Sequence, residues 1–370
     1  MSSIFFNSSR RKRTREDFKC EYIGEYDISG KRNGYGILTY ENGIKYQGEF
    51  RNDKFNGKGN MFYPRNWHLW GIVRKEFPSI EDLYICSYAR EDEGYTPELN
   101  YIGDFKDDIY HGKGMMIIDN KSTYTGDWRN GLKDGNGTLS ESNGYKYIGS
   151  WRDDLIDGEG IEIFENGNRY TGSFKKGLRC GEGTIIYKDG RVFSGLFNDN
   201  RPTSKGTLTY PDGSVYNGDY RYDQPNGFGI IEYIDGSVYS GEFRDGKFEG
   251  MGKIVKASGE EYEGMFLESL YDGFGKMKSP DGRTYFGQFA NGQFTGEGIL
   301  HFKTGGTLTG YFEVEKVSGI GLYSKTNGDR FIGQVENGRF QGVGALISSS
   351  GEIYVGEFKD GEKTGKGFTI

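Results

Sequence analysis

Residues 239–259 read YSGEFRDGKFEGMGKIVKASG, and residues 216–236, which begin 23 positions earlier, read YNGDYRYDQPNGFGIIEYIDG. The two stretches share few letters, but both place a ring, a Gly and a second ring at alternate positions. Both then carry a Gly-x-Gly pair and a closing Gly. A chain that keeps its glycines in phase while other positions vary is constrained by backbone geometry and ring packing, so this period decides the fold.

The period extends over most of the chain. Copies begin every 23 residues from Tyr101 to Tyr354, and two earlier copies begin at Tyr22 and Tyr46. All fourteen copies keep the Gly two places after the start and the second Gly of the Gly-x-Gly pair. The departures are Leu308 at the first ring position, Val335 at the second ring position and Ser204 at the first Gly of the pair.

Each copy predicts a β-hairpin. Tyr-x-Gly-x-Phe alternates with a period of two, so the rings and the Gly lie on one face of a strand. Gly-x-Gly-x-x-x-Tyr gives a second strand. Dipeptides such as Asn130-Gly131 and Asp212-Gly213 supply the positive φ angles that hairpin turns require. Isolated glycines weaken a strand, but here we expect them to open flat sites on which rings of neighbouring hairpins lie.

The predicted fold class is all-β, an elongated single-layer antiparallel array of about 14–15 stacked β-hairpins that forms a twisted ribbon. Fourteen hairpins give about 28 strands, which at about 4.8 Å each would span roughly 130 Å. The predicted domains are a basic N-terminal arm over 1–21, two repeats over 22–66, a degenerate repeat with an insertion over 67–100, and repeats 3–14 over 101–370.

The pattern resembles the MORN repeat family, whose name stands for membrane occupation and recognition nexus. The resemblance rests on Tyr-x-Gly-x-Phe, the Gly-marked turn and Gly-x-Gly, as in YTGSFKKGLRCGEG at residues 170–183, and it covers almost all of residues 22–370. It implies single-layer stacked hairpins and a role as a scaffold at membranes and the cytoskeleton, with phosphoinositide binding proposed for some members. Because the repeats fill the chain, the resemblance is to scaffolds without an appended enzyme domain.

Charge is distributed unevenly along the chain. Residues 1–20 carry six basic and two acidic side chains, a net +4, so the remainder of the chain, whose total charge is −7, carries −7 − 4 = −11. A basic arm on an acidic body is a candidate for contact with anionic lipid, for a nuclear localisation signal, or for a solvated tail. The candidate contact residues are Arg10, Arg11, Lys12, Arg13 and Arg15.

Chemistry-bearing motifs are sparse. The three histidines, His68, His111 and His301, have no partner at metal or catalytic spacing, and the three cysteines are widely spaced, as in free thiols of a reducing compartment. The Gly-x-Gly pairs lead into strands, so they offer no helix N-terminus to a phosphate. The sequence therefore predicts no enzyme activity, no catalytic or metal site and no cofactor.

Other proteins, either cytoskeletal or membrane-associated, are the expected partners, and phosphoinositides are the alternative. The acidic repeat body disfavours nucleic acid. The last strand, which includes Gly365, Gly367, Phe368 and Ile370, has no visible cap, so we expect a homodimer through this C-terminal edge. We expect a cytoplasmic protein at the cytoskeleton, a cilium or a membrane, with nuclear entry through the basic arm as an alternative.

Overall fold

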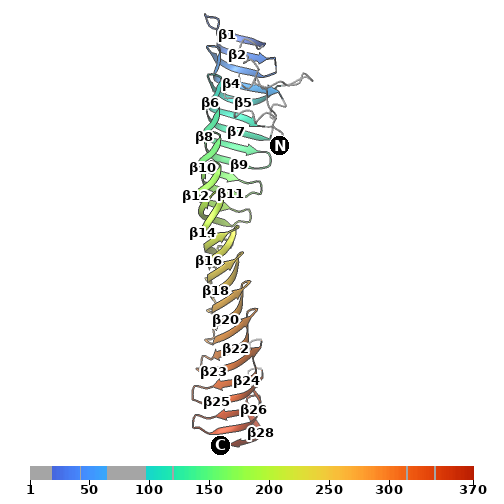
Figure 1. The fold of residues 1–370 in the computed structure, drawn as a ribbon, viewed down its shortest axis with the longest axis vertical. Helices are drawn as coiled ribbons and strands as arrows, with labels where there is room; N and C mark the ends of the chain where they lie inside the picture. Colours follow the sequence, from blue (N-terminus) through green and yellow to red (C-terminus); the bar gives the residue numbers. More distant parts are fainter. Residues whose placement is uncertain (1–18, 42, 65–96, 119–120, 314–315, 337–338) are drawn as a thin grey trace, which may run out of the picture. The chain divides into compact units, whose positions relative to one another are not determined.

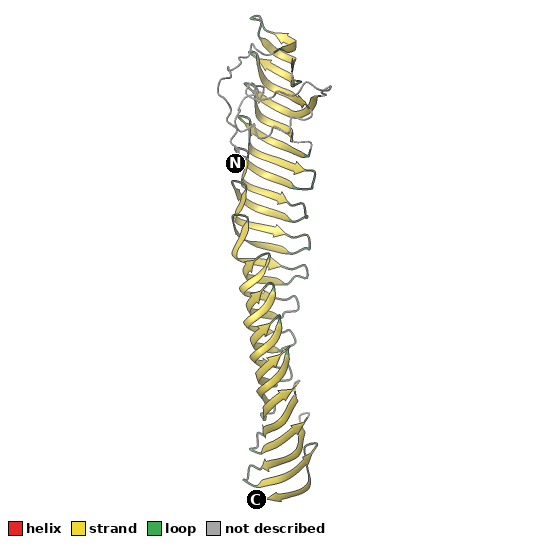
Figure 2. Ribbon diagram, turned by 45° about the vertical axis from the view of Figure 1, so that its right-hand side comes forward, coloured by secondary structure: helices red, strands yellow, loops and turns green. Residues whose placement is uncertain are grey.

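The computed structural model describes residues 19–41, 43–64, 97–118, 121–313, 316–336 and 339–370. Every regular element in these ranges is a β-strand, as Figure 1 and Figure 2 show. The 28 strands of the described chain make fourteen consecutive hairpins. The predicted all-β fold of stacked antiparallel hairpins is confirmed.

The strands fall into two compact units, and within each unit consecutive strands pair antiparallel, as β1 does with β2, β2 with β3, and β27 with β28. The first unit comprises residues 1–188 and 197–200, and the second comprises 189–196 and 201–370. The strands of the first unit are β1 (Cys20–Tyr26), β2 (Arg32–Tyr40), β3 (Lys45–Arg51), β4 (Lys54–Pro64), β5 (Pro97–Lys106), β6 (Ile109–Ile118), β7 (Ser122–Arg129), β8 (Leu132–Glu141), β9 (Lys146–Arg152), β10 (Leu155–Ile163), β11 (Arg169–Lys175) and β12 (Leu178–Ile186). β13 (Val192–Asn198) has residues in both units. The strands of the second unit are β14 (Arg201–Thr209), β15 (Val215–Arg221), β16 (Gln224–Glu232), β17 (Val238–Arg244), β18 (Lys247–Val255), β19 (Glu261–Leu267), β20 (Leu270–Lys278), β21 (Thr284–Ala290), β22 (Gln293–His301), β23 (Thr307–Glu313), β24 (Lys316–Ser324), β25 (Arg330–Glu336), β26 (Arg339–Ile347), β27 (Ile353–Lys359) and β28 (Glu362–Thr369).

Glycines of successive strands stand opposite one another and form a glycine row across each sheet. Gly241 of β17 pairs with Gly252 of β18, which in turn pairs with Gly264 of β19. A Cβ atom added to Gly252 would lie only 2.4 Å from the hydroxyl oxygen of Tyr239. The Tyr239 ring therefore occupies the volume that side chains at positions 241 and 252 would fill, which explains why both positions are glycine.

The buried rings also satisfy their own hydroxyl groups. Tyr239 has no exposed surface, and its hydroxyl donates a hydrogen bond to the carbonyl oxygen of Glu242 at 2.8 Å. Burial raises the pKa of the Tyr239 hydroxyl, so the ring stays neutral. The same bond to the backbone three residues further on is made by Tyr22, Tyr46, Tyr101, Tyr124, Tyr147, Tyr170, Tyr216, Tyr262 and Tyr285.

The structure corrects the expected position of the rings relative to the glycines. Tyr239 covers the glycines of its own hairpin, because its side chain leans along the strand over the next residue on the same face. Phe248 of the same hairpin stacks on it at 3.7 Å between ring centroids. The next hairpin contributes Phe266, whose ring meets Tyr239 edge to face at 5.1 Å. Each tyrosine ring thus covers glycines of its own hairpin, and the rings of successive hairpins meet edge to face.

The tight turns follow the predicted chemistry. Asn130 and Gly131 have φ angles of 51° and 82°, the paired positive values of a two-residue hairpin turn. Some copies place Asp, Asn or Ser at the second position. Asp108 there has a φ of 71°, and its Oδ1 accepts a hydrogen bond from the amide of Phe55 in the preceding hairpin at 2.7 Å. That bond offsets the backbone strain and ties neighbouring hairpins together.

Two expected segments fall outside the described residues. Most of the basic arm expected over 1–21 lies in residues 1–18, although Cys20 and Glu21 belong to β1, and most of the degenerate repeat expected over 67–100 lies in residues 65–96. β4 pairs directly with β5, with Gly59 opposite Gly103, so the glycine row continues from one strand to the other without interruption.

Candidate functional site

Each sheet has a ring face and an open face. The ring face carries the buried tyrosines and phenylalanines, while the side chains that alternate with them point to the open face. In β19, for example, burial alternates along the strand, with Tyr262 buried, Glu263 exposed, Met265 exposed and Phe266 buried. The described elements are all strands of the two sheets, so no other described element covers the open face.

The open face of the first unit combines ion pairs with apolar pairs such as Ile102 opposite Met115 and Ile148 opposite Ile161. Lys58 contacts Asp104 across β4 and β5 at 2.5 Å, and Lys113 contacts Asp127 across β6 and β7 at 2.5 Å. The carboxylates also accept backbone hydrogen bonds where the register shifts within a hairpin, as when Asp127 accepts from the amide of Asn136 at 2.8 Å. These acids hold the strand irregularity in place and are structural groups.

The electrostatics of Asp127 agree with this assignment. Partial burial opposes its ionisation, but the hydrogen bonds from Lys113 and from the amide of Asn136 outweigh burial and lower the pKa of the carboxyl. A general acid or base needs a pKa near the working pH. The lowered pKa of the Asp127 carboxyl moves it away from that range.

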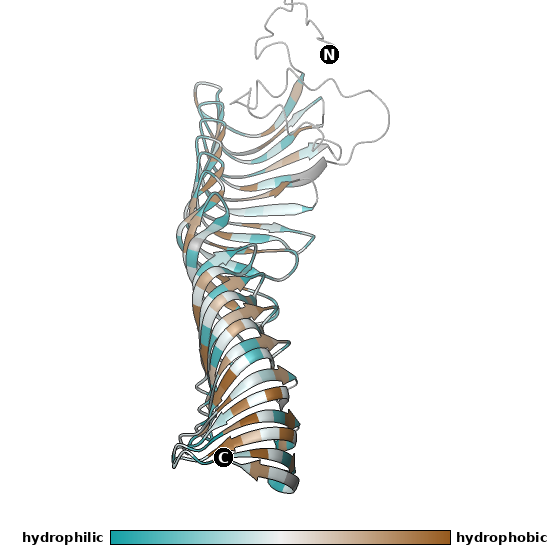
Figure 3. Cartoon of the chain, turned by 60° about the horizontal axis from the view of Figure 1, so that its bottom comes forward, coloured by the Kyte–Doolittle hydropathy of each residue, from teal (hydrophilic) through white to brown (hydrophobic). Residues whose placement is uncertain are grey.

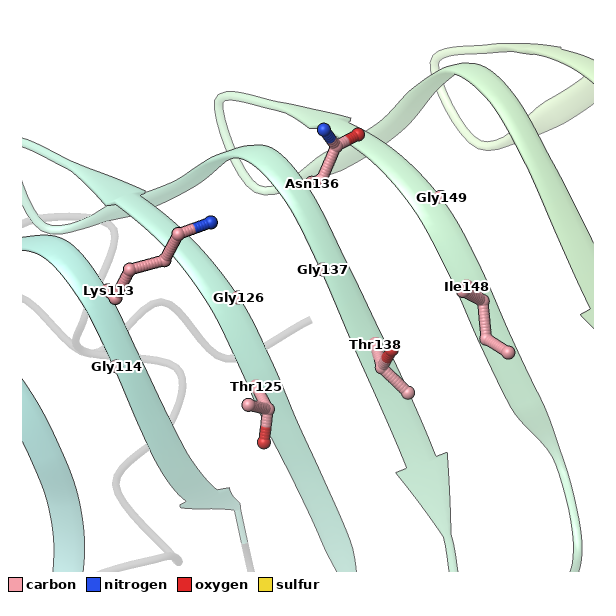
Figure 4. Close-up of a pocket in the computed structure, with 9 residues that line it drawn as sticks. All are labelled: Lys113, Gly114, Thr125, Gly126, Asn136, Gly137, Thr138, Ile148 and Gly149. Carbon is pink, nitrogen blue, oxygen red and sulfur yellow. The ribbon is translucent and has the colours of Figure 1, made fainter.

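A shallow groove of about 460 Å³ runs over the glycine row of the first unit, as Figure 4 shows. Lys113 and Asn136 stand on one side of the glycines, and Thr125, Thr138 and Ile148 stand on the other side. Its floor is formed by Gly114, Gly126, Gly137 and Gly149. The groove is therefore lined by glycines together with a few polar and apolar side chains.

The open face of the second unit exposes several large apolar side chains, and Figure 3 colours the apolar residues of both faces brown along the strands. Phe228, Met251, Phe274, Ile320 and Val343 expose between 53% and 73% of their surface. Each is the middle residue of a Gly-x-Gly pair. The same position in the first unit holds Tyr35, Lys58, Lys113, Asn136, Glu159 and Glu182. This change was not predicted from the sequence, although the middle residues of the Gly-x-Gly pairs indicate it.

The predicted edge residues are at the end of the second unit. Gly365, Gly367 and Phe368 belong to β28, which pairs with β27, and Ile370 exchanges two backbone hydrogen bonds with Ile353. Phe368 and Ile370 expose 60% and 76% of their surface. The predicted arm residues Arg10, Arg11, Lys12, Arg13 and Arg15 lie outside the described residues.

Basic side chains near the hairpin tips of the first unit are partly engaged. Lys175 pairs with Asp157 at 3.3 Å. Arg179 lies over the rings of Phe164 and Tyr170 at 5.0 Å and 5.5 Å. Arg179 is therefore a packing residue, and its charge is only partly available to a ligand.

Among the described residues, no group of three or more His, Cys, Asp or Glu side chains could hold a metal ion. The described part of the chain also contains no helix long and apolar enough to cross a membrane. Cys20 and Cys180 are free thiols.

A family model described as MORN repeat matches thirteen segments that together cover well over half of the chain. It passes over residues 308–330, where Leu308 replaces the first ring, but the structure forms the hairpin β23–β24 there. A search of curated protein sequences gives no match. The matched segments are residues 22–45, 46–67, 101–123, 124–144, 147–169, 170–190, 193–215, 216–238, 239–261, 262–282, 285–307, 331–353 and 354–369.

Solved structures with a similar arrangement are distant. The TCP domain of Drosophila melanogaster SAS-4, in complex with a proline-rich motif of Ana2, is 13% identical with a TM-score of 0.27, over 42% of this chain and 86% of that one. The TCP10 domain of Danio rerio CPAP is 14% identical with a TM-score of 0.26, over 61% and 95%. Virginiamycin B lyase from Staphylococcus aureus is 10% identical with a TM-score of 0.12, over 66% and 83%. TM-scores this low support no inference about function.

Proposed function

This chain belongs to the MORN repeat family, and we propose that it is a non-enzymatic scaffold that organises other proteins at the cytoskeleton or at the membrane–cytoskeleton interface. The observation that carries the proposal is the open face. Strand after strand presents side chains there that the ring core does not use. Weak contacts to many similar sites add up when a partner engages several at once. The cytoskeletal setting rests on the family resemblance.

Bridging distinguishes a scaffold from a protein with one partner. Proximity labelling in the native cell should identify at least two different proteins. These two proteins should co-purify with each other only in cells that contain this chain. Substituting the open face of one unit, for example Ile320→Glu in the second, should remove one partner and leave the other. If only one partner is recovered, and substitutions on neither open face change its recovery, the scaffold proposal is excluded.

A second candidate function is binding to phosphoinositides or other anionic lipids through the basic arm and through basic side chains of the hairpin tips. One observation favours it, namely a basic residue at the same phase in five consecutive repeats of the first unit. All five side chains are exposed, although acidic neighbours partly neutralise Arg129, Arg152 and Lys175. The five residues are Arg51, Lys106, Arg129, Arg152 and Lys175.

Flotation with phosphoinositide-containing vesicles tests this candidate. Replacing Arg10–Arg13 and Arg15 with Ser should abolish binding if the arm carries it. Replacing Arg51 and Lys106 with Ser should weaken binding if the hairpin tips contribute. Flotation should also fall as salt rises from 50 to 500 mM, because exposed charges are screened. If the unaltered chain does not float with the vesicles, the scaffold remains as the single candidate function.

Self-association through the C-terminal edge is the third part of the proposal. Because Ile370 exchanges two backbone hydrogen bonds with Ile353, the alternation of an antiparallel pair turns the N–H of Thr369 away from β27. That N–H is free to pair with a second copy. Thr369→Pro should therefore shift the mass toward monomer in light scattering without loosening β28, and an unchanged mass would reject the edge as the contact.

A further inference from the structure

The first and last strands of the described chain each have an open edge. Among the described strands, β1 pairs only with β2, and β28 pairs only with β27. An unpaired edge presents a row of backbone N–H and C=O groups that can bond to another strand. The two edges differ in kind, because β1 is the first strand of its hairpin and β28 is the second strand of its own.

Inside the chain, the second strand of one hairpin pairs with the first strand of the next. The register of this junction repeats, with Gly36 opposite Gly48 near the start of the chain and Gly344 opposite Gly356 near its end. β28 is a second strand that no first strand follows, and β1 is a first strand that no described second strand precedes. The two edges are therefore the two halves of a junction that the protein already forms between its own hairpins.

This junction does not need a short connection between its strands. Residues 65–96 separate β4 from β5 in the sequence, yet Gly59 is opposite Gly103 in the usual register. Lys58 also contacts Asp104 across the same pair of strands at 2.5 Å. A second strand and a first strand can thus pair without the tight turn that joins them elsewhere, and pairing between two chains requires the same property.

The ring face is incomplete at both edges. The second ring of an internal hairpin is buried, as Phe50 is with 3% of its surface exposed, whereas Tyr26 at the same position of the first hairpin exposes 59%. At the other edge, Phe331 is met edge to face at 4.9 Å by Phe358 of the following hairpin. Tyr354, at the same position of the last hairpin, is partly exposed. Each edge therefore holds one of the two rings of an edge-to-face contact.

We propose that copies of this protein join head to tail, with the outer edge of β28 of one copy (the tail) paired to the outer edge of β1 of the next (the head). This rests on the self-association proposed above for the C-terminal edge, and it names the surface that the edge meets. The internal register places Gly367 opposite Gly24 of the second copy, as Gly344 is opposite Gly356. Each joined pair keeps one open head and one open tail, so assembly continues beyond two copies.

That register brings apolar side chains together. It places Phe368 opposite Ile23 of the second copy, where Ala345 is opposite Val355 inside the chain. Phe368 exposes 60% of its surface. Ile23 exposes 65%, against 39% for Ile102 at the same phase of an internal repeat. The junction removes apolar surface of both residues from water, which favours association.

Charge favours the pairing of unlike edges. β1 contains Glu21 and Glu25 and no basic residue, a net charge of −2, while β28 contains one glutamate and two lysines, a net charge of +1. Two heads or two tails would bring like charges together, which destabilises strand pairing. Complementary charge therefore selects the head-to-tail junction over a two-fold pairing of either edge with itself.

Sedimentation velocity on the full chain tests the proposal. The unaltered chain should form oligomers larger than dimers, and their size should grow with concentration. Ile23→Glu and Phe368→Glu should each weaken assembly about tenfold, because each places a carboxylate opposite an apolar side chain. The matched control Ile102→Glu, at the same phase of an internal repeat, should leave assembly unchanged. Circular dichroism checks that all three variants keep their strands.

Mixing the two edge variants identifies which edges meet. The tail of the Ile23→Glu chain and the head of the Phe368→Glu chain are both unaltered, so an equimolar mixture should form dimers with one chain of each kind. Each variant alone should remain monomeric at the same concentration.

The other outcomes separate this proposal from those above. If Ile23→Glu alone still dimerises as the unaltered chain does, the C-terminal edge pairs with itself and the head-to-tail junction is rejected. If the unaltered chain is monomeric at every concentration, both the junction and self-association through the C-terminal edge are rejected. Neither result affects the scaffold, which the bridging of two partners tests.

Discussion

Gly252→Ala isolates the reason for the glycine row. The backbone of Gly252 does not have a positive φ, so alanine can adopt it without strain. The added Cβ would lie 2.4 Å from the hydroxyl oxygen of Tyr239 and 2.7 Å from two of its ring carbons. Ordinary contact begins about 1 Å further out, so the ring must move.

The magnitude follows from what the ring loses. Forcing an extra carbon into a packed site costs about 1–3 kcal/mol. Displacing the Tyr239 hydroxyl from the carbonyl of Glu242 costs about 1 kcal/mol more. Replacing Gly with Ala returns about 0.5–1 kcal/mol through the reduced entropy of the unfolded chain. We therefore expect Gly252→Ala to destabilise the hairpin β17–β18 by about 1–3 kcal/mol.

Hydrogen exchange is the suitable assay, because a repeat array opens locally and a single unfolding free energy is ill-defined. Amides of residues 239–255 should exchange faster, by the factor that corresponds to this loss of stability. The exchange rates of amides in distant repeats should not change. In a Tyr239→Ala background, Gly252→Ala should be neutral or protective, because no ring remains to be displaced. If the two substitutions were additive, or if Gly252→Ala slowed exchange in the intact chain, the ring-on-glycine explanation would fail.

Three further predictions test other parts of the fold. Burial raises the pKa of Tyr170 and Tyr285 to about 12, against about 10 in the unfolded chain. Because the unfolded state loses these protons first, the stability of the fold should fall as pH rises from 10 to 12. Phenolate absorbance at 295 nm should then appear together with loss of the strand signal in circular dichroism. Leu308→Tyr should stabilise β23–β24 by about 1 kcal/mol, since it restores a ring over the paired Gly310 and Gly321; faster exchange there would contradict this. Asn200→Ala should cost about 1–2 kcal/mol of stability, because alanine would have to keep the φ of 69° and the hydrogen bond from the amide of Arg179, 2.8 Å long, would be lost. Asn200→Gly should cost less, because glycine tolerates that φ. Equal losses of stability for the two variants in thermal unfolding would show that the bond does not matter.

The change in the open face along the chain separates structural from functional constraint. Tyr239 and Gly252 are fixed by a contact inside one hairpin. Lys113 and Ile320 occupy the same position in their repeats, yet one is charged and the other apolar. Packing of the core cannot distinguish them, because neither contributes to the ring face.

The sequence by itself determined the elements of this protein. A 23-residue period, alternation of rings with glycine and Gly-marked turns require only local backbone geometry, and that geometry specifies fourteen hairpins without reference to distant residues. The asymmetry between a basic arm and an acidic body could also be read from residue types alone.

Only the tertiary structure decided how the hairpins meet. Each hairpin changes register between its two glycines and its turn, as between Gly241 and Glu242, so neighbours across strands cannot be counted from the repeat alone. That register places Tyr239 over its own glycines and brings Phe266 of the next hairpin to its edge. It also aligns Phe286 with Ile299, and Leu322 with Ile332, in a single row. A surface built from separate strands exists only once pairing has placed those strands side by side.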